Sequence, residues 1–229
     1  MATTEFDRVS ALRRTALFAT AQESTLHQLA QASRVRRLAK GTTLAISGDA
    51  PAYMWVVASG LLRVFVTSFN GDEPTLVVLA AGDHAGELGV LDNIPRSASI
   101  GTLRASELIE IPAEVFRTAY RADPAIPMQL VHLLAQRLRS TSGSLADLTY
   151  LDLGARIAKY LVSKSDHIGA TTVTVELTQG ELGQMLGGAR QTVNQLLQSL
   201  ERAGLIVING RTVRLLDVDG LRLRSLSSP

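Results

Sequence analysis

Residues 177–216 read LTQGELGQMLGGARQTVNQLLQSLERAGLIVINGRTVRLL, and local rules predict a structure for nearly all of this stretch. Thr178 and Glu181 form the T-x-x-E pattern of a capping box, which opens a helix. The Gly187–Gly188 pair ends that helix, because glycine readily adopts the left-handed conformation of a helix C-terminus. A second helix is then expected from about Ala189 to Ala203, so the segment predicts two helices joined by a tight turn.

A β-hairpin is expected directly after the two helices. The apolar runs LIVI and TVRLL flank Asn209–Gly210, which is a strong hairpin signal. Helix, turn, helix and hairpin in this order predict a winged helix-turn-helix, with an ordinary small α/β subdomain as the alternative. The second helix favours the former, because it begins with the polar run RQTVNQ, which could enter a major groove. Its apolar residues lie on the opposite side: Val193, Leu196, Leu197 and Leu200.

The first half of the chain has a different pattern. From Gly41 onward, short apolar runs such as YMWVV, LLRVFV, TLVVLA and ELIEIP alternate with turn signals such as SGD and NGD. This pattern predicts antiparallel strands that close into a β-barrel or jelly roll of about eight strands. Residues 6–38 are expected to be helical and amphipathic. The apolar anchors of this helical region are Leu12, Leu17, Phe18, Leu26, Leu29 and Leu38.

A long helix is expected to begin near Asp123 and Pro124. Its apolar positions recur at three- and four-residue spacing, which indicates a coiled-coil seam with a partner helix. The alternative is a helix that packs on its own barrel. The seam turns polar at Thr141 and Ser142, which suggests register control or a ligand at the interface. A further helix is expected at about Leu151–Lys164. The seam positions are Met128, Val131, Ala135, Leu138, Ser142, Leu145 and Leu148.

Composition excludes several classes of protein. The 229 residues are 46% apolar and 19% charged, so a core can be buried. No cysteine is present, which excludes disulfides, thiolate sensing, cysteine-ligated zinc and iron–sulfur clusters. The sequence has no apolar run of membrane-span length and no segment of signal-peptide type, so we expect a cytoplasmic protein without a membrane partner. No metal site is expected, because the histidines are scattered: His27, His84, His132 and His167.

A second informative stretch, GELGVLDNIPRSAS, covers residues 86–99 and is expected to form a loop. The guanidinium of Arg96 suits an oxyanion, and Ser97 can add a hydroxyl donor to it. Glu87 accepts hydrogen bonds and suits a sugar hydroxyl, while Gly86 allows close backbone approach. A cyclic nucleotide offers both groups, whereas the alternative is an internal Glu87–Arg96 salt bridge without a ligand. No nucleophile–base pair is evident, so no enzymatic activity is expected.

These segments together resemble the Crp/Fnr family of bacterial transcription factors, in its cyclic AMP receptor branch. The resemblance runs through GTTLAISGD, SGLLRVF, the stretch at 86–99, RLRSTSGSLADL and the helix-turn-helix, so it covers nearly the whole chain. It implies an α+β fold with a cyclic-nucleotide-binding β-barrel or jelly-roll domain and N-terminal helices over residues 1–122. A long dimerisation helix and hinge would follow over 123–149, and a winged helix-turn-helix DNA-binding domain over 150–229.

The resemblance also implies roles for the ligand-binding residues. Glu87 would accept from the ribose 2′-hydroxyl, while Arg96 would hold the cyclic phosphate. Arg137 and Thr141 would lie over the adenine, and Ser142 would reach across from the other subunit, which favours cyclic AMP. Ala85 is a departure, because the family often has an aromatic residue there. The implied ligand-binding residues are Gly86, Glu87, Leu88, Arg96, Ser97, Ala98, Arg137, Thr141 and Ser142.

The recognition helix departs further from the family pattern. Arg190 can still make a bidentate contact to a guanine. Gln191 replaces the family's usual glutamate, and its amide favours adenine. Gln195 stands where the family has an arginine, so we expect a palindromic operator related to the family's familiar site but different from it. Candidate DNA-binding residues are Thr178, Gln179, Ala189, Arg190, Gln191, Thr192, Asn194, Gln195 and Arg211.

The resulting expectation is a homodimeric, cyclic AMP-responsive regulator that binds double-stranded DNA and contacts RNA polymerase. Two alternatives stay open: a regulator that binds DNA without a ligand, and a cyclic-nucleotide-binding module that acts on a protein partner. A haem sensor is more distant, because His84 lies near the stretch at 86–99 but no second axial ligand is evident.

Overall fold

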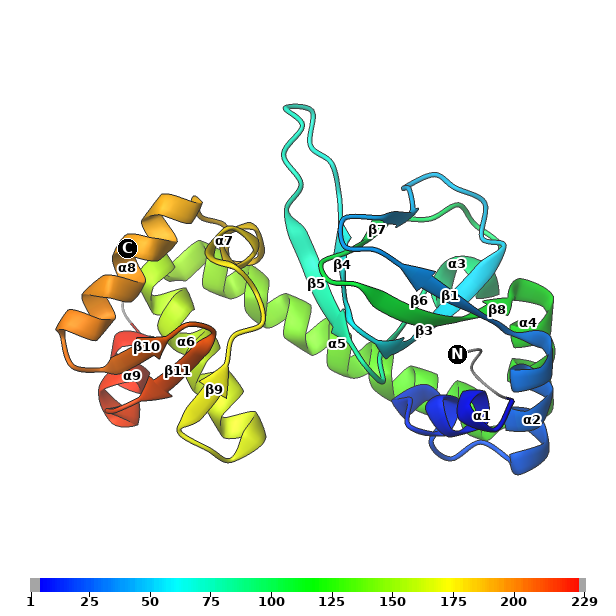
Figure 1. The fold of residues 1–229 in the computed structure, drawn as a ribbon. Helices are drawn as coiled ribbons and strands as arrows, with labels where there is room; N and C mark the ends of the chain where they lie inside the picture. Colours follow the sequence, from blue (N-terminus) through cyan, green and yellow to red (C-terminus); the bar gives the residue numbers. More distant parts are fainter. Residues whose placement is uncertain (1–4, 227–229) are drawn as a thin grey trace. The chain divides into compact units, whose positions relative to one another are not determined.

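The structure, a computed structural model, describes residues 5–226 of the chain. Two units, Met1–Leu138 and Arg139–Pro229, make up the chain, and their boundary falls within the long helix α5 (Ala125–Tyr150) (Figure 1). No helix of the described part is long and apolar enough to cross a membrane.

Two four-stranded antiparallel sheets form the body of the first unit, which confirms the predicted antiparallel β-structure. Trp55 pairs with Glu110 on one side and with Ala85 on the other, and this register places the candidate site. The first sheet has the order β1 (Arg34–Leu38), β8 (Ser106–Pro112), β3 (Tyr53–Ser59), β6 (His84–Ala85). The second has the order β2 (Thr43–Ala45), β7 (Ser99–Thr102), β4 (Leu61–Phe65), β5 (Thr75–Ala80).

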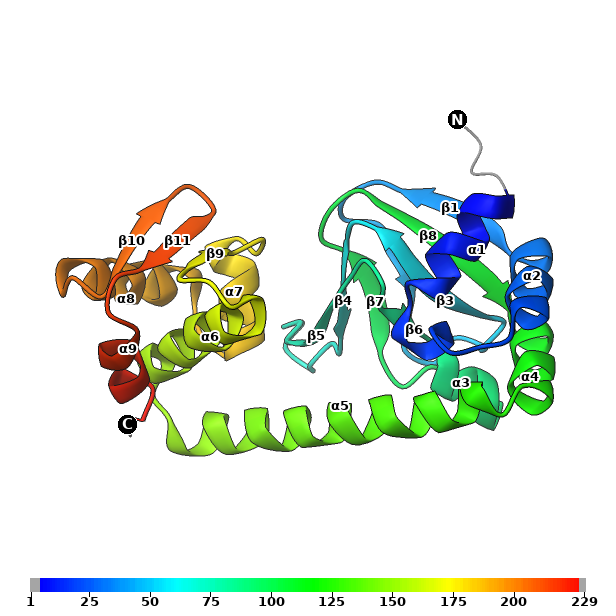
Figure 2. The ribbon, with the colours of Figure 1, turned by 90° about the horizontal axis from the view of Figure 1, so that it is seen from below.

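Strand β3 is apolar at successive positions because both of its faces are buried. Trp55 and Val57 point into the barrel, where they join a cluster with Leu62, Leu79, Ile100 and Leu108. Met54 and Val56 point the other way and pack with residues of the helices at one end of the barrel. Those helical elements are α1 (Glu5–Arg13), η1 (Ala16–Phe18), α2 (Glu23–Ala32) and α4 (Ala113–Ala122) (Figures 1 and 2).

The prediction of helix throughout residues 6–38 is wrong at its C-terminal end. Helix α2 ends at Ala32, and Ser33 is already extended, with φ −88° and ψ 162°. Residues Arg34–Leu38 instead form strand β1, which pairs along its length with β8. Leu38 therefore packs against the barrel interior and not in a helix. Tertiary pairing with a strand far along the chain overrides the local helical pattern here.

The second unit is a winged helix-turn-helix, as predicted. Glu181 N donates to Thr178 Oγ1 at 3.3 Å and Thr178 N donates to Glu181 Oε2 at 2.7 Å, which completes the capping box. Strand β9 and helix α9 were not anticipated. The elements are α6 (Leu153–Ile168), β9 (Thr172–Thr174), α7 (Gln179–Leu186), α8 (Arg190–Arg202), β10 (Ile206–Asn209), β11 (Thr212–Leu215) and α9 (Val218–Arg224).

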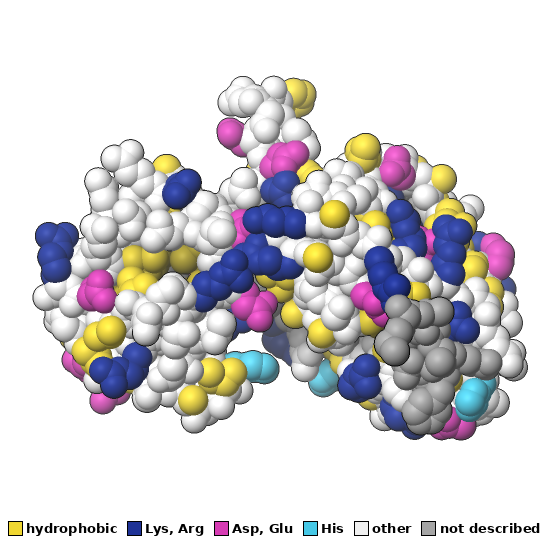
Figure 3. Space-filling model, in the orientation of Figure 1, with side chains coloured by type: hydrophobic (Ala, Val, Ile, Leu, Met, Phe, Trp, Pro, Cys, Tyr) yellow, Lys and Arg dark blue, Asp and Glu magenta, His cyan; other side chains and the backbone are white. Residues whose placement is uncertain are grey.

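Large apolar side chains are exposed on α5 and on the connection between β4 and β5. Along α5, a row of apolar side chains is more than half exposed, whereas Ile126 and Leu130 of the same helix are buried. The connection between β4 and β5, which contains the fully exposed Phe69, projects from the barrel (Figure 3). The exposed residues of α5 are Met128, Val131, Leu138, Leu145 and Leu148.

Candidate functional site

The stretch predicted as a loop at residues 86–99 begins with a short helix, α3 (Glu87–Asp92). Gly86 precedes this helix with φ +86°, a conformation that glycine adopts without strain, so the chain can turn sharply from β6 into α3. A Cβ atom at this position would lie 2.6 Å from Arg96 Nη1 and 3.1 Å from Trp55 Cζ3. Gly86 is thus required both by its conformation and by the close approach of two side chains.

Arg96 is buried, and its guanidinium is held from several sides. Its Nη1 donates to Gly86 O at 2.8 Å, and its Nη2 donates to Tyr53 O. The guanidinium carbon lies 4.6 Å from the centre of the Trp55 ring. Burial lowers the pKa of Arg96, while the nearby Glu87 and Asp49 oppose that shift. Arg96 Nε is buried and, within residues 5–226, has no hydrogen-bond partner.

The backbone around Arg96 is fixed by the GTTLAISGD segment. Arg96 N donates to Asp49 O at 2.9 Å, and Gly48 N donates to Arg96 O at 2.8 Å. Ser47 N donates to Ser99 Oγ at 3.0 Å. Two motifs that lie far apart in the sequence therefore form one unit, in which residues 47–49 hold the segment that carries Arg96.

Glu87 is 1% exposed and lies at the start of α3. Its Oε1 accepts a hydrogen bond from Arg137 Nη1 of α5 at 3.2 Å. Its Oε2 is buried and, among the residues that the structure describes, has no hydrogen-bond partner. No ion pair joins Glu87 to Arg96 in that part of the chain, so the internal salt bridge considered as an alternative does not form. Glu87 pairs with Arg137 instead.

His84 adds a third buried polar group, which the sequence had suggested only as a distant haem ligand. Its Nε2 lies 3.9 Å from Glu87 Oε1 and makes no hydrogen bond within the described residues. Burial lowers the pKa of His84; Glu87 and Asp83 raise it, and Arg137 lowers it further. The imidazole is consequently neutral at neutral pH.

The structure brings together Gly86, Glu87, Arg96 and Arg137 of the residues suggested for ligand binding. Ser97 and Leu88 are exposed, while Ala98 is partly buried. Thr141 and Ser142 belong to the second unit and are exposed on α5. Sequence reasoning missed Trp55 and the carbonyl of Tyr53, because both lie in an apolar run that is typical of a buried strand.

A second candidate site lies at the start of α8. Arg190, Gln191, Thr192 and Gln195 are exposed on it, opposite the buried Val193, Leu197 and Leu200. Gln179 Nε2 of α7 donates to Asn194 Oδ1 of α8 at 3.0 Å, which ties the two helices together. Ala189, the N-cap residue of α8, gives the helix no side-chain cap. Arg211, between β10 and β11, is exposed. A surface cavity of about 370 Å³ is lined by Thr178, Gln179, Gly180 and Arg190.

Both units match known protein families. A cyclic nucleotide-binding domain matches residues 35–123, and a Crp-like helix-turn-helix domain matches residues 155–224. The cAMP-activated global transcriptional regulator CRP of Haemophilus influenzae is 33% identical over 177 residues, which is 75% of this chain and 79% of that protein. A CRP-like cAMP-activated global transcriptional regulator of Mycobacterium tuberculosis is 29% identical over 93% of this chain and 98% of its own length.

Solved structures share the fold. The c-di-GMP responsive global regulator CLP of Xanthomonas campestris superposes with a TM-score of 0.71 at 24% identity, over 85% of this chain and 99% of that one. The domain matches and the similarity to curated regulators agree with the fold of each unit and with their order along the chain. The chain therefore belongs to the Crp/Fnr family of transcriptional regulators, with a cyclic nucleotide-binding domain followed by a Crp-type helix-turn-helix.

Proposed function

We propose that this chain is a cyclic AMP-responsive transcriptional regulator that binds a palindromic operator as a homodimer. The observation that carries the proposal is the pair of unsatisfied buried atoms, Glu87 Oε2 and Arg96 Nε. Buried polar atoms of this kind destabilise a protein by about 1–3 kcal/mol each, more when charged, unless a partner is supplied. A ligand that presents a hydroxyl donor and an anionic oxygen would supply both partners.

A cyclic nucleotide fits these groups. Its phosphate would accept from Arg96, with Ser97 and the backbone at Ala98 as further donors. Its ribose hydroxyl would donate to Glu87 Oε2, which is free while Oε1 holds Arg137. The lack of a side chain at Gly86 lets the Arg96 guanidinium lie close to the turn before α3, and the backbone at Leu88 would assist.

Adenine is the favoured base because Arg137, Thr141 and Ser142 match the adenine-contacting pattern of the cyclic AMP receptor branch. Two relatives described above are named as cAMP-activated, which supports the same ligand. The similar Xanthomonas regulator responds to c-di-GMP, so that nucleotide is the natural competitor to test.

The exposed apolar row of α5 supports a dimer. Five large apolar side chains at heptad-like spacing are exposed in the single chain, and a second copy of α5 would cover them in a coiled-coil seam. A dimer would present two α8 helices to successive major grooves, about 34 Å apart. RNA polymerase is the expected further partner, in the cytoplasm.

Calorimetric titration with cyclic AMP tests the ligand, with the unsubstituted chain compared to Arg96→Leu. We expect binding to the former and none to the latter, while circular dichroism shows both folded. DNA fragments selected from a random pool should be retarded more strongly with cyclic AMP present. Equal affinity for cyclic AMP in both proteins would refute the phosphate contact. Equal DNA affinity with and without cyclic AMP would instead indicate a regulator that needs no ligand.

A further inference from the structure

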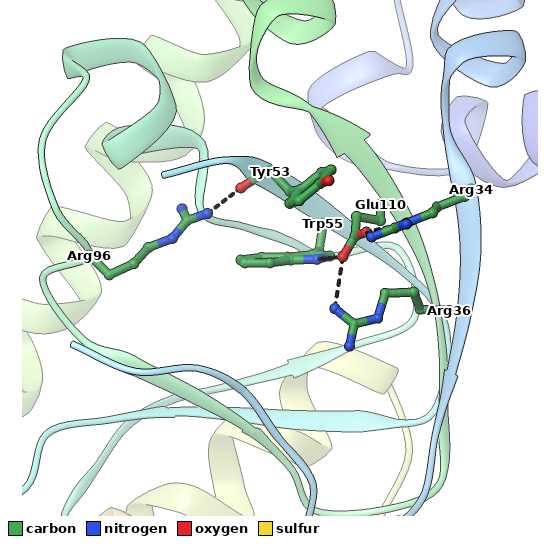
Figure 4. Close-up of polar contacts among 6 residues, drawn as sticks. All are labelled: Arg34, Arg36, Tyr53, Trp55, Arg96 and Glu110. Carbon is green, nitrogen blue, oxygen red and sulfur yellow. Dashed lines mark hydrogen bonds and ion pairs between the residues drawn. The ribbon is translucent and has the colours of Figure 1, made fainter. Parts of the chain in front are cut away.

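The side chain of Trp55 lies between the guanidinium of Arg96 and the carboxylate of Glu110 (Figure 4). One face of its ring lies against the guanidinium of Arg96, whose carbon is 4.6 Å from the ring centre. Its indole nitrogen points the other way, toward Glu110 (Figure 4). The ring is 4% exposed, and it is the only tryptophan in the sequence. A large aromatic ring therefore connects the proposed phosphate-binding arginine to a buried carboxylate on a different strand.

Glu110 fixes one edge of this ring. Trp55 Nε1 donates to Glu110 Oε2 at 2.8 Å, and Arg36 Nη1 donates to the same oxygen at 2.9 Å. Arg34 Nε donates to Glu110 Oε1 at 2.5 Å. Burial raises the pKa of the fully buried Glu110, but the hydrogen bonds from Trp55, Arg36 and Arg34 outweigh it and leave the pKa lowered. Glu110 is thus a carboxylate whose two oxygens are both engaged.

The opposite edge of the ring is confined by Gly86. A Cβ atom at Gly86 would lie 3.1 Å from Trp55 Cζ3, so the ring lies directly beneath the turn that leads into α3. With one edge hydrogen-bonded and the other packed, the ring plane has little freedom. An aromatic face attracts a cation electrostatically, and the attraction is stronger where water is excluded. The fixed ring therefore determines the plane on which the Arg96 guanidinium rests.

We propose that Trp55, held by Glu110, is the positioning residue that orients Arg96 for the phosphate of the nucleotide. The inference rests on the proposed function. The carbonyl oxygens of Gly86 and Tyr53 accept from Nη1 and Nη2, while the ring supports one face of the guanidinium. Arg96 Nε then remains free to donate to an anionic oxygen.

Two substitutions of Trp55 separate positioning from packing. Trp55→Phe keeps an aromatic face, whereas Trp55→Met replaces the ring by an apolar chain that is closer in volume to phenylalanine than to tryptophan and has no aromatic face. We expect Trp55→Met to bind cyclic AMP about 3- to 30-fold more weakly than the unsubstituted chain, the range for loss of a cation–π contact. Trp55→Phe should recover most of that loss. Calorimetry gives the affinities, and thermal melts show that the two variants are equally folded.

A second pair of variants tests whether the hydrogen bond to Glu110 fixes the Trp55 ring. Glu110→Leu removes the acceptor for the indole and should weaken cyclic AMP binding when Trp55 is present. In a Trp55→Phe chain the same substitution should leave the affinity unchanged, because phenylalanine has no N–H group to be held. This comparison of affinities stands even if Trp55→Met does not fold. An equal loss from Glu110→Leu in both backgrounds would overturn the role of Glu110.

The outcomes distinguish this inference from the proposed function. If the unsubstituted chain binds cyclic AMP, Arg96→Leu does not, and Trp55→Met binds as tightly as the unsubstituted chain, only the inference fails. Equal weakening in Trp55→Phe and Trp55→Met would also overturn it, because the ring would then act through packing alone. No binding of cyclic AMP to the unsubstituted chain would overturn the proposed function, and the inference with it.

Discussion

Replacement of Gly86 by alanine is the sharpest test of the site geometry. Gly86 has φ +86°, and a Cβ atom there would lie 2.6 Å from Arg96 Nη1. Gly41 is a matched control, since it has φ +78° and a Cβ atom there would meet nothing within 4 Å. Both substitutions impose the same backbone strain, but only Gly86→Ala forces the guanidinium to move.

The two variants should differ in stability by a measurable amount. A non-glycine residue in the left-handed region costs about 1–2 kcal/mol, and this applies to both positions. Gly86→Ala also breaks the hydrogen bond from Arg96 Nη1 to Gly86 O, and hydrogen bonds of charged groups contribute about 1.5–3 kcal/mol. We therefore expect a loss in unfolding free energy of about 3–5 kcal/mol for Gly86→Ala and about 1–2 kcal/mol for Gly41→Ala.

Chemical denaturation measures these losses, and calorimetry with cyclic AMP measures the consequence for binding. Gly41→Ala should bind as the unsubstituted chain does. Gly86→Ala should bind about ten- to hundredfold more weakly, because a displaced guanidinium loses a charge-assisted contact to phosphate. The reasoning is refuted if the two alanine variants bind cyclic AMP equally, or if Gly86→Ala is no less stable than Gly41→Ala.

Three further predictions concern other parts of the chain. Burial lowers the pKa of His84 below its ordinary 6.5, so the unfolded chain binds a proton at His84 at a higher pH than the folded chain does. The free energy of unfolding should therefore fall as the pH drops from about 7 toward 5. His84→Gln should flatten this profile in pH-dependent melts and the exposed His27→Gln should not; parallel profiles would contradict the assignment. Arg190→Ala should relax preference at one guanine per half-site, by about 1–3 kcal/mol, in a random-site selection, and an unaltered preference would count against that contact. Leu145→Glu, at a side chain 66% exposed, should shift sedimentation toward monomer while circular dichroism shows that the chain is still folded; an unchanged dimer would place the interface elsewhere.

The helix-turn-helix could be predicted because its signals are local. The capping box of Thr178 and Glu181 and the left-handed Gly187 act within one turn of helix, so the sequence alone defines the ends of α7. The N-terminal region could not be predicted in this way. Arg34–Leu38 is a strand because it pairs with β8, and no feature within residues 6–38 reports a partner some seventy positions away.

The candidate ligand site also has one part that the sequence predicts and one part that it does not. Glu87 and Arg96 stand out in the sequence because charged groups in a short segment between apolar runs need a reason. Trp55 does not stand out, since a tryptophan inside an apolar strand is ordinary core. Its role depends on the register that sets it opposite Glu110 and beside Ala85, which only the assembled sheet defines.

The pairing of Glu87 suggests how a ligand could be sensed. Its Oε1 is bonded to Arg137 of α5 and its Oε2 is free, so a ribose hydroxyl can bind without displacing Arg137. A base that engages the Arg137 guanidinium would, in contrast, compete with Oε1 for it. In the proposed complex the sugar would add a hydrogen-bond partner at Glu87, and the base would draw Arg137 away from Glu87, on the helix that carries the exposed apolar row. Selectivity among nucleotides would then depend on the α5 side of the site, because any ribose cyclic phosphate offers the same groups to Glu87 and Arg96.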